Sequence, residues 1–170
     1  ATPNDTTGDV GPNHYVQTIN SSFRVYDQTG TRLEGPPGLG QLWNNGDATT
    51  DACEQNAGDP VVLYDNLADR WMIAQFSRFV PFRNIMCLAV SVTADPRLSQ
   101  GYYAYTFDMG AFPDYLKIGA WLDGYYFSAN GNGNALVAVF DRSSMLNGVP
   151  AGAVQFNAVL VVLLRVIAVY

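Results

Sequence analysis

An internal repeat is the sequence feature that most constrains how this chain can fold. Three segments led by aromatic residues, HYVQTIN (14–20), RWMIAQFS (70–77) and GYYFSAN (124–130), follow one another along the sequence. Their lead residues Tyr15, Trp71 and Tyr126 are spaced by 56 and 55 residues. A second β-type run and a turn marked by glycine or proline follow each segment. A fixed period of this kind predicts one structural unit repeated along the chain.

The repeated unit predicts an all-β fold. Each unit holds three or four short apolar runs, and only RSSMLNG (142–148) has the pattern of a helical turn. Repeated units of four strands and 40–50-odd residues are typical of β-propeller blades, whereas a β-sandwich needs no internal period. We therefore predict a single β-propeller domain with approximate repeats 4–58, 59–113 and 114–168.

Three repeats are fewer than a closed propeller requires. Propellers close with four to eight blades, and an open arrangement exposes two aromatic-rich edges. We therefore expect the rest of a longer chain to complete the propeller, with other chains completing the ring as the alternative.

The segment GDPVVLYDNLADRW (58–71) predicts a hairpin at the start of the second unit. Pro60 stands at the first position of a strand, where it removes no ladder hydrogen bond. Asp65 and Asp69 flank a polar turn, in which a short carboxylate accepts backbone N–H bonds. Trp71 then supplies a large apolar surface for burial between neighbouring blades.

Three motifs carry a resemblance to a known group of proteins. The chain resembles secreted bacterial proteins with propeller-type repeats, mostly of unassigned function, in VGPNHYVQTINSSFRVYD, GDPVVLYDNLADRWMIAQFS and FPDYLKIGAWLDGYYFSAN. Leu116 and Leu122 stand where the third motif of that group usually has proline. The resemblance implies a secreted, extracellular protein with a propeller fold that continues past this length, and it implies no particular active site.

Charge and hydropathy exclude two classes of partner. The net charge is −6, and the nine lysines and arginines are scattered, whereas nucleic-acid binding requires clustered positive charge. The segment AVLVVLLRVIAVY (158–170) is too short for a membrane span, which needs about 20 apolar residues. We expect neither nucleic-acid binding nor a membrane span.

Two cysteines allow a single bridge. Cys53 lies in a polar loop and Cys87 in the β-type run MCLAVSV. We predict a Cys53–Cys87 disulfide, as suits an exported protein, with two separate thiols as the alternative.

The aspartates Asp59 and Asp114 are the first candidate site. They lie 55 residues apart, so equivalent positions in neighbouring blades would place both at the mouth of a central channel. Two carboxylates there could act as acid and base in glycan cleavage, or could join carbonyl groups around a hard cation. The alternative is structural, with each carboxylate capping the backbone where its strand begins.

An acidic, amide-rich loop, NNGDATTDACEQNAGD (44–59), is the second candidate. Its acidic residues are Asp47, Asp51, Glu54 and Asp59. Oxygen ligands of this kind suit Ca²⁺, although their spacing differs from that of an EF-hand. The alternative is a solvated connection held by Cys53.

The tyrosines Tyr102, Tyr103 and Tyr105 in GYYAYTF (101–107) are the third candidate. Clustered rings of this kind serve on sugar-binding faces, and the alternative is packing between blades. The only histidine, His14, has no sequence partner that would form a triad, and no GxSxG or zinc motif is present.

These features favour a binding module over an enzyme. We predict an exported propeller that binds a polysaccharide or a cell-surface protein, with no required cofactor. A glycoside hydrolase or polysaccharide lyase that uses Asp59 and Asp114 is the first alternative. A non-catalytic scaffold is the second, because propellers host many functions.

Overall fold

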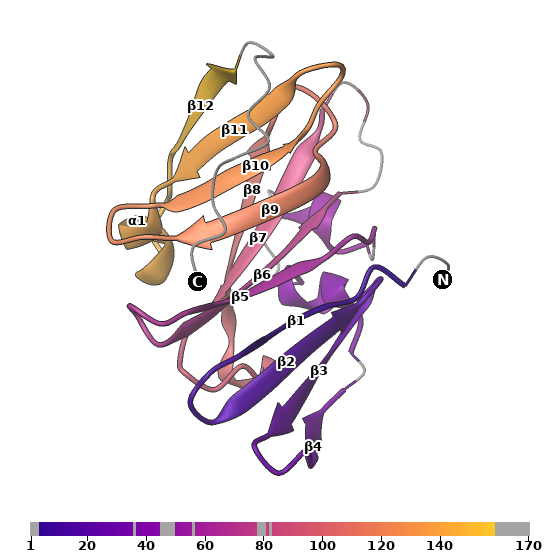
Figure 1. The fold of residues 1–170 in the computed structure, drawn as a ribbon, viewed down its shortest axis with the longest axis vertical. Coiled ribbons are helices and arrows are strands. Elements are labelled where there is room, and N and C mark those ends of the chain that lie inside the picture. Colours follow the sequence, from indigo (N-terminus) through magenta and orange to yellow (C-terminus); the bar gives the residue numbers. More distant parts are fainter. Residues whose placement is uncertain are drawn as a thin grey trace.

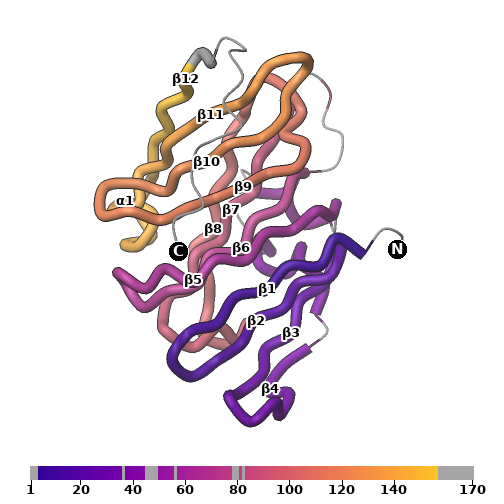
Figure 2. The backbone as a smooth tube through the Cα atoms, in the orientation of Figure 1, coloured from indigo at the N-terminus to yellow at the C-terminus, as the bar shows by residue number. Residues whose placement is uncertain are grey.

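The protein has an all-β fold of three four-stranded antiparallel sheets, as the repeat predicts. The computed structural model describes residues 4–35, 37–44, 50–55, 57–77, 81 and 83–158. The three sheets follow one another in chain order, from the indigo N-terminal sheet to the yellow C-terminal strand (Figure 1). The backbone trace shows that each sheet is a meander of sequential strands (Figure 2).

Each sheet lies within one of the three predicted repeats. Sheet 1 contains β1 (Thr7–Val10), β2 (His14–Ile19), β3 (Ser22–Asp27) and β4 (Arg32–Glu34). Sheet 2 contains β5 (Val61–Asp65), β6 (Arg70–Phe76), β7 (Ile85–Ser91) and β8 (Tyr102–Asp108). Sheet 3 contains β9 (Asp114–Ala120), β10 (Tyr125–Asn130), β11 (Ala135–Phe140) and β12 (Ala153–Ala158).

The first strands of the three sheets are neighbours in space. Strand β1 contacts β5, and β5 contacts β9, although none of these pairs belongs to one hydrogen-bonded sheet. The Asp9 carboxylate on β1 accepts a 2.7 Å hydrogen bond from the backbone N–H of Tyr64 on β5. The sheets therefore approach one another along their first strands.

Short helical segments connect the strands. They are η1 (Leu39–Leu42), η2 (Asp51–Cys53), η3 (Leu98–Gln100) and α1 (Arg142–Leu146). The predicted helical turn at 142–148 is confirmed by α1, whose N-cap Asp141 accepts a 3.0 Å hydrogen bond from the Ser144 backbone N–H. The predicted disulfide is also confirmed, and it joins Cys53 at the end of η2 to Cys87 on β7.

Two separate apolar cores fill the spaces between the sheets. The first core lies between sheets 1 and 2 and includes Val16, Phe23, Val25, Leu39, Trp43, Trp71, Ile73 and Cys87. The second lies between sheets 2 and 3 and includes Met72, Met86, Leu88, Val90, Tyr125, Phe127, Ala138 and Phe140. Alternate residues of β6 and β7 belong to different cores, because successive side chains of a strand point to opposite faces. Sheet 2 is therefore covered on both faces, which explains the continuous apolar runs of β6 and β7.

The alignment of lead aromatics by sequence is wrong by one residue in the third unit. Trp71 is buried in the first core, facing sheet 1, as predicted for a ring between neighbouring units. The equivalent inward residue of sheet 3 is Tyr125, which is fully buried and faces sheet 2. Tyr126 points to the opposite face and is 38% exposed. The reason is that two adjacent tyrosines occupy the strand start, and a strand alternates its faces with every residue.

Two parts of the sequence predictions fall outside the described residues. Residues 159–170, most of the apolar segment 158–170, are among them, and so is Asp47. Within the part of the chain that the structure describes, no helix has the length and apolar character needed to cross a membrane.

Candidate functional site

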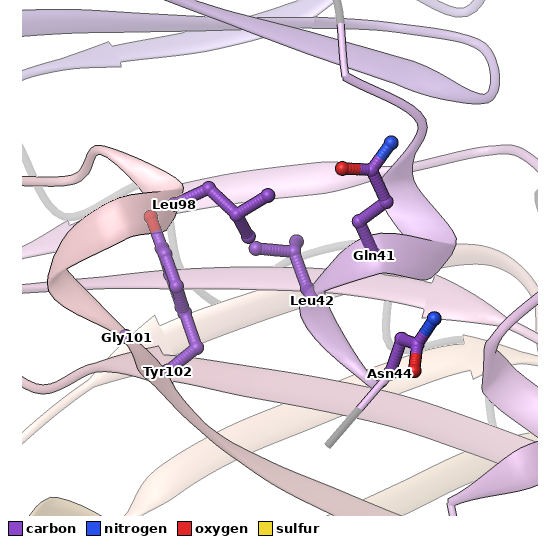
Figure 3. A pocket seen from close by; sticks show the side chains of 6 residues that line it. All are labelled: Gln41, Leu42, Asn44, Leu98, Gly101 and Tyr102. Atoms are coloured by element: carbon purple, nitrogen blue, oxygen red, sulfur yellow. The ribbon is translucent and has the colours of Figure 1, made fainter. Parts of the chain in front are cut away.

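A cleft between the connections of sheets 1 and 2 is the first candidate site. It has a volume of about 660 Å³ and is lined by Gln41, Leu42, Asn44, Leu98, Gly101 and Tyr102. Leu98 and Tyr102 lie on one side, Gln41 and Asn44 lie on the other, and Leu42 lies between them (Figure 3). The cleft therefore combines residues of η1 and its C-terminal flank with residues of η3 and the start of β8.

The six described residues that line this cleft are all uncharged. Gln41 and Asn44 contribute exposed carboxamides, each of which can donate and accept hydrogen bonds. Leu42, Leu98 and the ring of Tyr102 contribute apolar surface. The lining thus combines polar and apolar groups, and the cleft volume lies in the usual range for small-molecule sites of about 300–1,000 Å³.

Local packing fixes the two sides of the cleft relative to each other. The Leu98 backbone N–H donates a 2.5 Å hydrogen bond to the carboxylate of Glu34 on β4. The Tyr102 hydroxyl donates a 2.6 Å hydrogen bond to the Pro96 carbonyl, and burial raises the pKa of this phenol. Tyr102 therefore presents its ring to the cleft, while its hydroxyl remains engaged with the backbone.

The three predicted tyrosines do not form one surface. Tyr102 lines the cleft, but the ring of Tyr103 lies against Gly148, after α1. The Tyr105 hydroxyl lies 3.2–3.3 Å from the carbonyl oxygens of Ser144, Met145 and Val149. Packing against the α1 segment thus accounts for Tyr103 and Tyr105, and a sugar-binding role for these two stays a prediction.

The second candidate site is a group of aspartates at the points where the first strands of the three sheets, β1, β5 and β9, begin. Burial raises the pKa of Asp59, and the negative charges of Asp5 and Asp114 raise it further, as does a hydrogen bond with Asp5. The predicted pair Asp59 and Asp114 is thus brought within electrostatic range, and Asp5 joins it from the first repeat. Asp5 lies 54 residues before Asp59, so the repeat period could have identified it.

Asn20 links the first two members of this group. Its carboxamide nitrogen donates a 3.1 Å hydrogen bond to Asp5, and its carboxamide oxygen accepts a 3.2 Å bond from the Asp59 backbone N–H. Asp5 and Asp59 both have positive φ, at 40° and 48°, a region that aspartate tolerates better than most residues. Gly58, with a φ of 112°, passes directly beneath the Asn20 carboxamide, where a Cβ atom would collide with it.

The predicted calcium ligands are described only in part. Asp47 lies outside the described residues, Asp51 is exposed at the start of η2, and Glu54 caps that helix at its C-terminal end. Asp59 lies near Asp5 and Asp114, whose negative charges raise its pKa. Among the described residues, no group of three or more His, Cys, Asp or Glu side chains is arranged to hold a metal ion. Calcium at the loop 44–59 therefore stays a prediction.

His14 has an acidic neighbour from another sheet. Its Nε2 lies 3.9 Å from the Asp95 carboxylate, which also accepts hydrogen bonds from Arg97. These contacts lower the pKa of Asp95, chiefly through its hydrogen bond with Arg97. His14 thus contributes to the contact between sheets 1 and 2.

Comparison of the chain with protein-family models, with curated proteins and with solved structures gives no match.

Proposed function

We propose that this chain is part of an exported β-propeller that binds a neutral polysaccharide in the cleft between η1 and η3. The observation that carries the proposal is the cleft lining, in which two carboxamides lie beside two leucines and one aromatic ring. Sugar hydroxyls need groups that both donate and accept hydrogen bonds, and the apolar faces of sugar rings need apolar contacts. The absence of charge among the six lining residues favours an uncharged ligand.

The propeller arrangement is supported by the contacts between the sheets. Successive four-stranded meanders whose first strands are neighbours, with an apolar core between each pair, are what wedges around one axis require. Export is supported by the Cys53–Cys87 disulfide, because such bonds persist in oxidising compartments.

The test is a glycan-array screen of the chain, followed by calorimetric titration of the best neutral oligosaccharide. The variant Gln41→Ala, Asn44→Ala should weaken binding at least about fivefold, because each lost hydrogen bond contributes about 0.5–1.5 kcal/mol. The matched control is Asn13→Ala, Asn66→Ala, which removes two exposed carboxamides from hairpin turns. Equal affinity in the cleft variant and the control variant would reject the cleft as the binding site.

A second candidate function is glycan cleavage by Asp59 and Asp114. The raised pKa of Asp59 favours it, because a general acid must hold its proton near the working pH. Incubation of the chain with polysaccharides of different linkage, followed by a reducing-sugar assay, tests for cleavage. Any activity should disappear in the variant Asp59→Asn, Asp114→Asn, and activity that survives in this variant would remove both residues from the reaction.

A further inference from the structure

Among the described residues, sheet 3 has one face that is covered by sheet 2 and one that no other element covers. The open face carries apolar side chains from three neighbouring strands: Tyr126, Val137, Val139, Val154 and Phe156. Tyr126 is paired with Val139, Val139 with Val154, and Val137 with Phe156, so the five side chains form one continuous patch. Val154 and Phe156 are 61% and 51% exposed. A continuous patch of this kind, unlike scattered apolar residues, marks an interaction surface.

The repeat shows what this face does elsewhere in the same chain. The equivalent faces of the other two sheets are buried against the sheet that follows them. In sheet 1 this face carries Val16, Phe23 and Val25, which pack into the first core against sheet 2. In sheet 2 it carries Met72, Met86 and Leu88, which pack into the second core against sheet 3. The open face of sheet 3 is thus the third copy of a docking face that is used twice within the chain.

Sheet 1 carries the complementary open face. Its side chains alternate with the buried ones and include Tyr15, Gln17, Arg24 and Tyr26, with the rings of Tyr15 and Tyr26 6.2 Å apart. Val10, which pairs with Tyr15, is 66% exposed. The corresponding faces of sheets 2 and 3 carry Trp71 and Tyr125 at the position of Tyr15, and both rings are buried against the preceding sheet.

We propose that a second copy of this chain covers both open faces, with sheet 3 of each copy packing against sheet 1 of the other. One chain carries both halves of the junction that it already makes twice internally, so a second copy offers a matching face to each open face. Two copies supply six four-stranded sheets, which lies within the four to eight blades that close a propeller. The resulting ring has two identical junctions related by a two-fold axis.

The sheet 1 half of the proposed junction is more polar than the internal ones. Gln17 stands in β2 where Ile73 stands in β6 and Phe127 in β10. A more polar interface is typical of partners that also exist apart, so we expect a reversible dimer. This inference rests on the propeller arrangement proposed above. It is independent of the cleft, because the cleft lies between η1 and η3 of one chain.

The experiment is sedimentation velocity over about 1 to 100 μM, the range that resolves micromolar dimers. The chain should shift from 18.5 kDa toward twice that mass as its concentration rises. The variant Val154→Asp, Phe156→Asp disables the sheet 3 face, and Val10→Asp, Tyr15→Asp disables the sheet 1 face. Each should remain monomeric at every concentration, whereas the control Leu67→Asp, at an exposed turn residue, should dimerise like the parent chain. Far-UV circular dichroism establishes that each chain is folded.

Mixing the two disabled variants gives the decisive result. Each retains the face that the other lacks, so an equimolar mixture should form a dimer with one intact junction, although neither variant dimerises alone. A parent chain that stays at 18.5 kDa throughout would overturn the proposal. Dimerisation of the Val10→Asp, Tyr15→Asp variant alone would also overturn it, because the sheet 3 faces would then pair with each other. Either failure leaves glycan binding unaffected, and loss of glycan binding in the cleft variant leaves the dimer unaffected.

Discussion

The two junctions between neighbouring sheets are built from the same repeat but are held by different chemistry. Between sheets 1 and 2, the connection that contains η1 and η2 packs into the core and is fixed by the Cys53–Cys87 disulfide. The fully buried Gln75 adds a 2.9 Å hydrogen bond from its carboxamide to the Cys53 carbonyl. The buried part of the first junction thus depends on a covalent bond and on neutral groups, whereas its carboxylate contacts, such as that of Asp9 with Tyr64, lie nearer the surface.

The second junction depends on a buried ion pair. Asp65, fully buried at the end of β5, accepts hydrogen bonds from Arg142 Nε at 2.7 Å and Nη2 at 3.1 Å. The Tyr125 hydroxyl donates a third bond to the same carboxylate at 2.8 Å. The hydrogen bond with Asp65 raises the pKa of the Arg142 guanidinium above its ordinary value. A polar network therefore attaches sheet 3 to sheet 2, whereas a disulfide attaches the connection between sheets 1 and 2 to β7.

The comparison shows how a repeated fold accommodates divergent sequence. The apolar faces recur because neighbouring sheets pack against each other through them. The polar attachments differ because each needs only to satisfy its own buried groups. Substitutions that remove one attachment at a time measure how far the two junctions are independent.

The largest expected effect is at the ion pair. Asp65→Asn keeps the shape of the side chain but leaves the Arg142 charge buried without a partner, which typically costs about 3–5 kcal/mol of unfolding free energy. Urea denaturation of the variant and of the parent chain measures the loss. Asp69→Asn is the matched control, because it makes the same change at an exposed position of the same turn. Equal losses in the two variants would show that the buried pair contributes no more than a surface carboxylate.

A double-mutant cycle separates the pair from the rest of its surroundings. The variant Asp65→Asn, Arg142→Gln should lose less stability than the sum of the two single changes, because no charge is then left unpaired. Additive losses would contradict a direct energetic coupling between Asp65 and Arg142.

The disulfide has the next largest expected effect. The bond spans 34 residues, and closing a loop of that length stabilises a fold by about 3–4 kcal/mol in the chain-entropy treatment. Cys53→Ala, Cys87→Ala should lower the unfolding free energy by about that amount. Unfolding is followed by tryptophan fluorescence, because Trp43 and Trp71 both lie in the first core. An unchanged urea midpoint would show that η2 is held by packing alone.

The sequence predicts the repeated parts of this molecule better than the attachments between them. The repeat period predicts three β units and Trp71 as a buried ring, because both follow from local sequence pattern. The disulfide is predicted separately, because the chain has only two cysteines. The alignment of the three aromatic-led strands fails at Tyr125 and Tyr126, because either tyrosine fits the sequence pattern. Only the pairing register of the strands decides which one faces the core. Asp65 is correctly expected to accept a turn N–H, and it does so from Leu67 at 3.1 Å.

The contacts that the pattern does not predict are made between distant segments. Arg142 reaches Asp65 across 77 residues, and neither residue belongs to a motif that names the other. The cleft likewise joins Gln41 to Tyr102 through two connections whose lengths differ from unit to unit. The repeat period would place an equivalent of Asp59 near Asp5, which lies 54 residues earlier. The dipeptide Gly8-Asp9, however, matches Gly58-Asp59 in sequence, so sequence similarity favours Asp9 over Asp5.

The smallest expected effect is at Asp59, whose carboxylate is repelled by the like charges of Asp5 and Asp114. The pKa of Asp59 is raised above its ordinary value of 3.8, by burial first and then by Asp5 and Asp114. The folded state therefore favours the protonated form, so this group's contribution to stability is full below that ordinary value and is lost as the pH rises through the folded-state pKa.

Asparagine imitates the protonated form and tolerates the positive φ at this position. Asp59→Asn should thus stabilise the chain at pH 7 by no more than about 0.5 kcal/mol, because solvent screens a partly exposed carboxylate, and the gain should vanish below about pH 4. Thermal unfolding at both pH values, with the exposed Asp51→Asn as control, measures the difference. A loss of stability at pH 7 would contradict this prediction. It would mean that the charged Asp59 carboxylate makes favourable contacts that outweigh its repulsion by Asp5 and Asp114, as the contacts of Asp65 with Arg142 are favourable in the second junction.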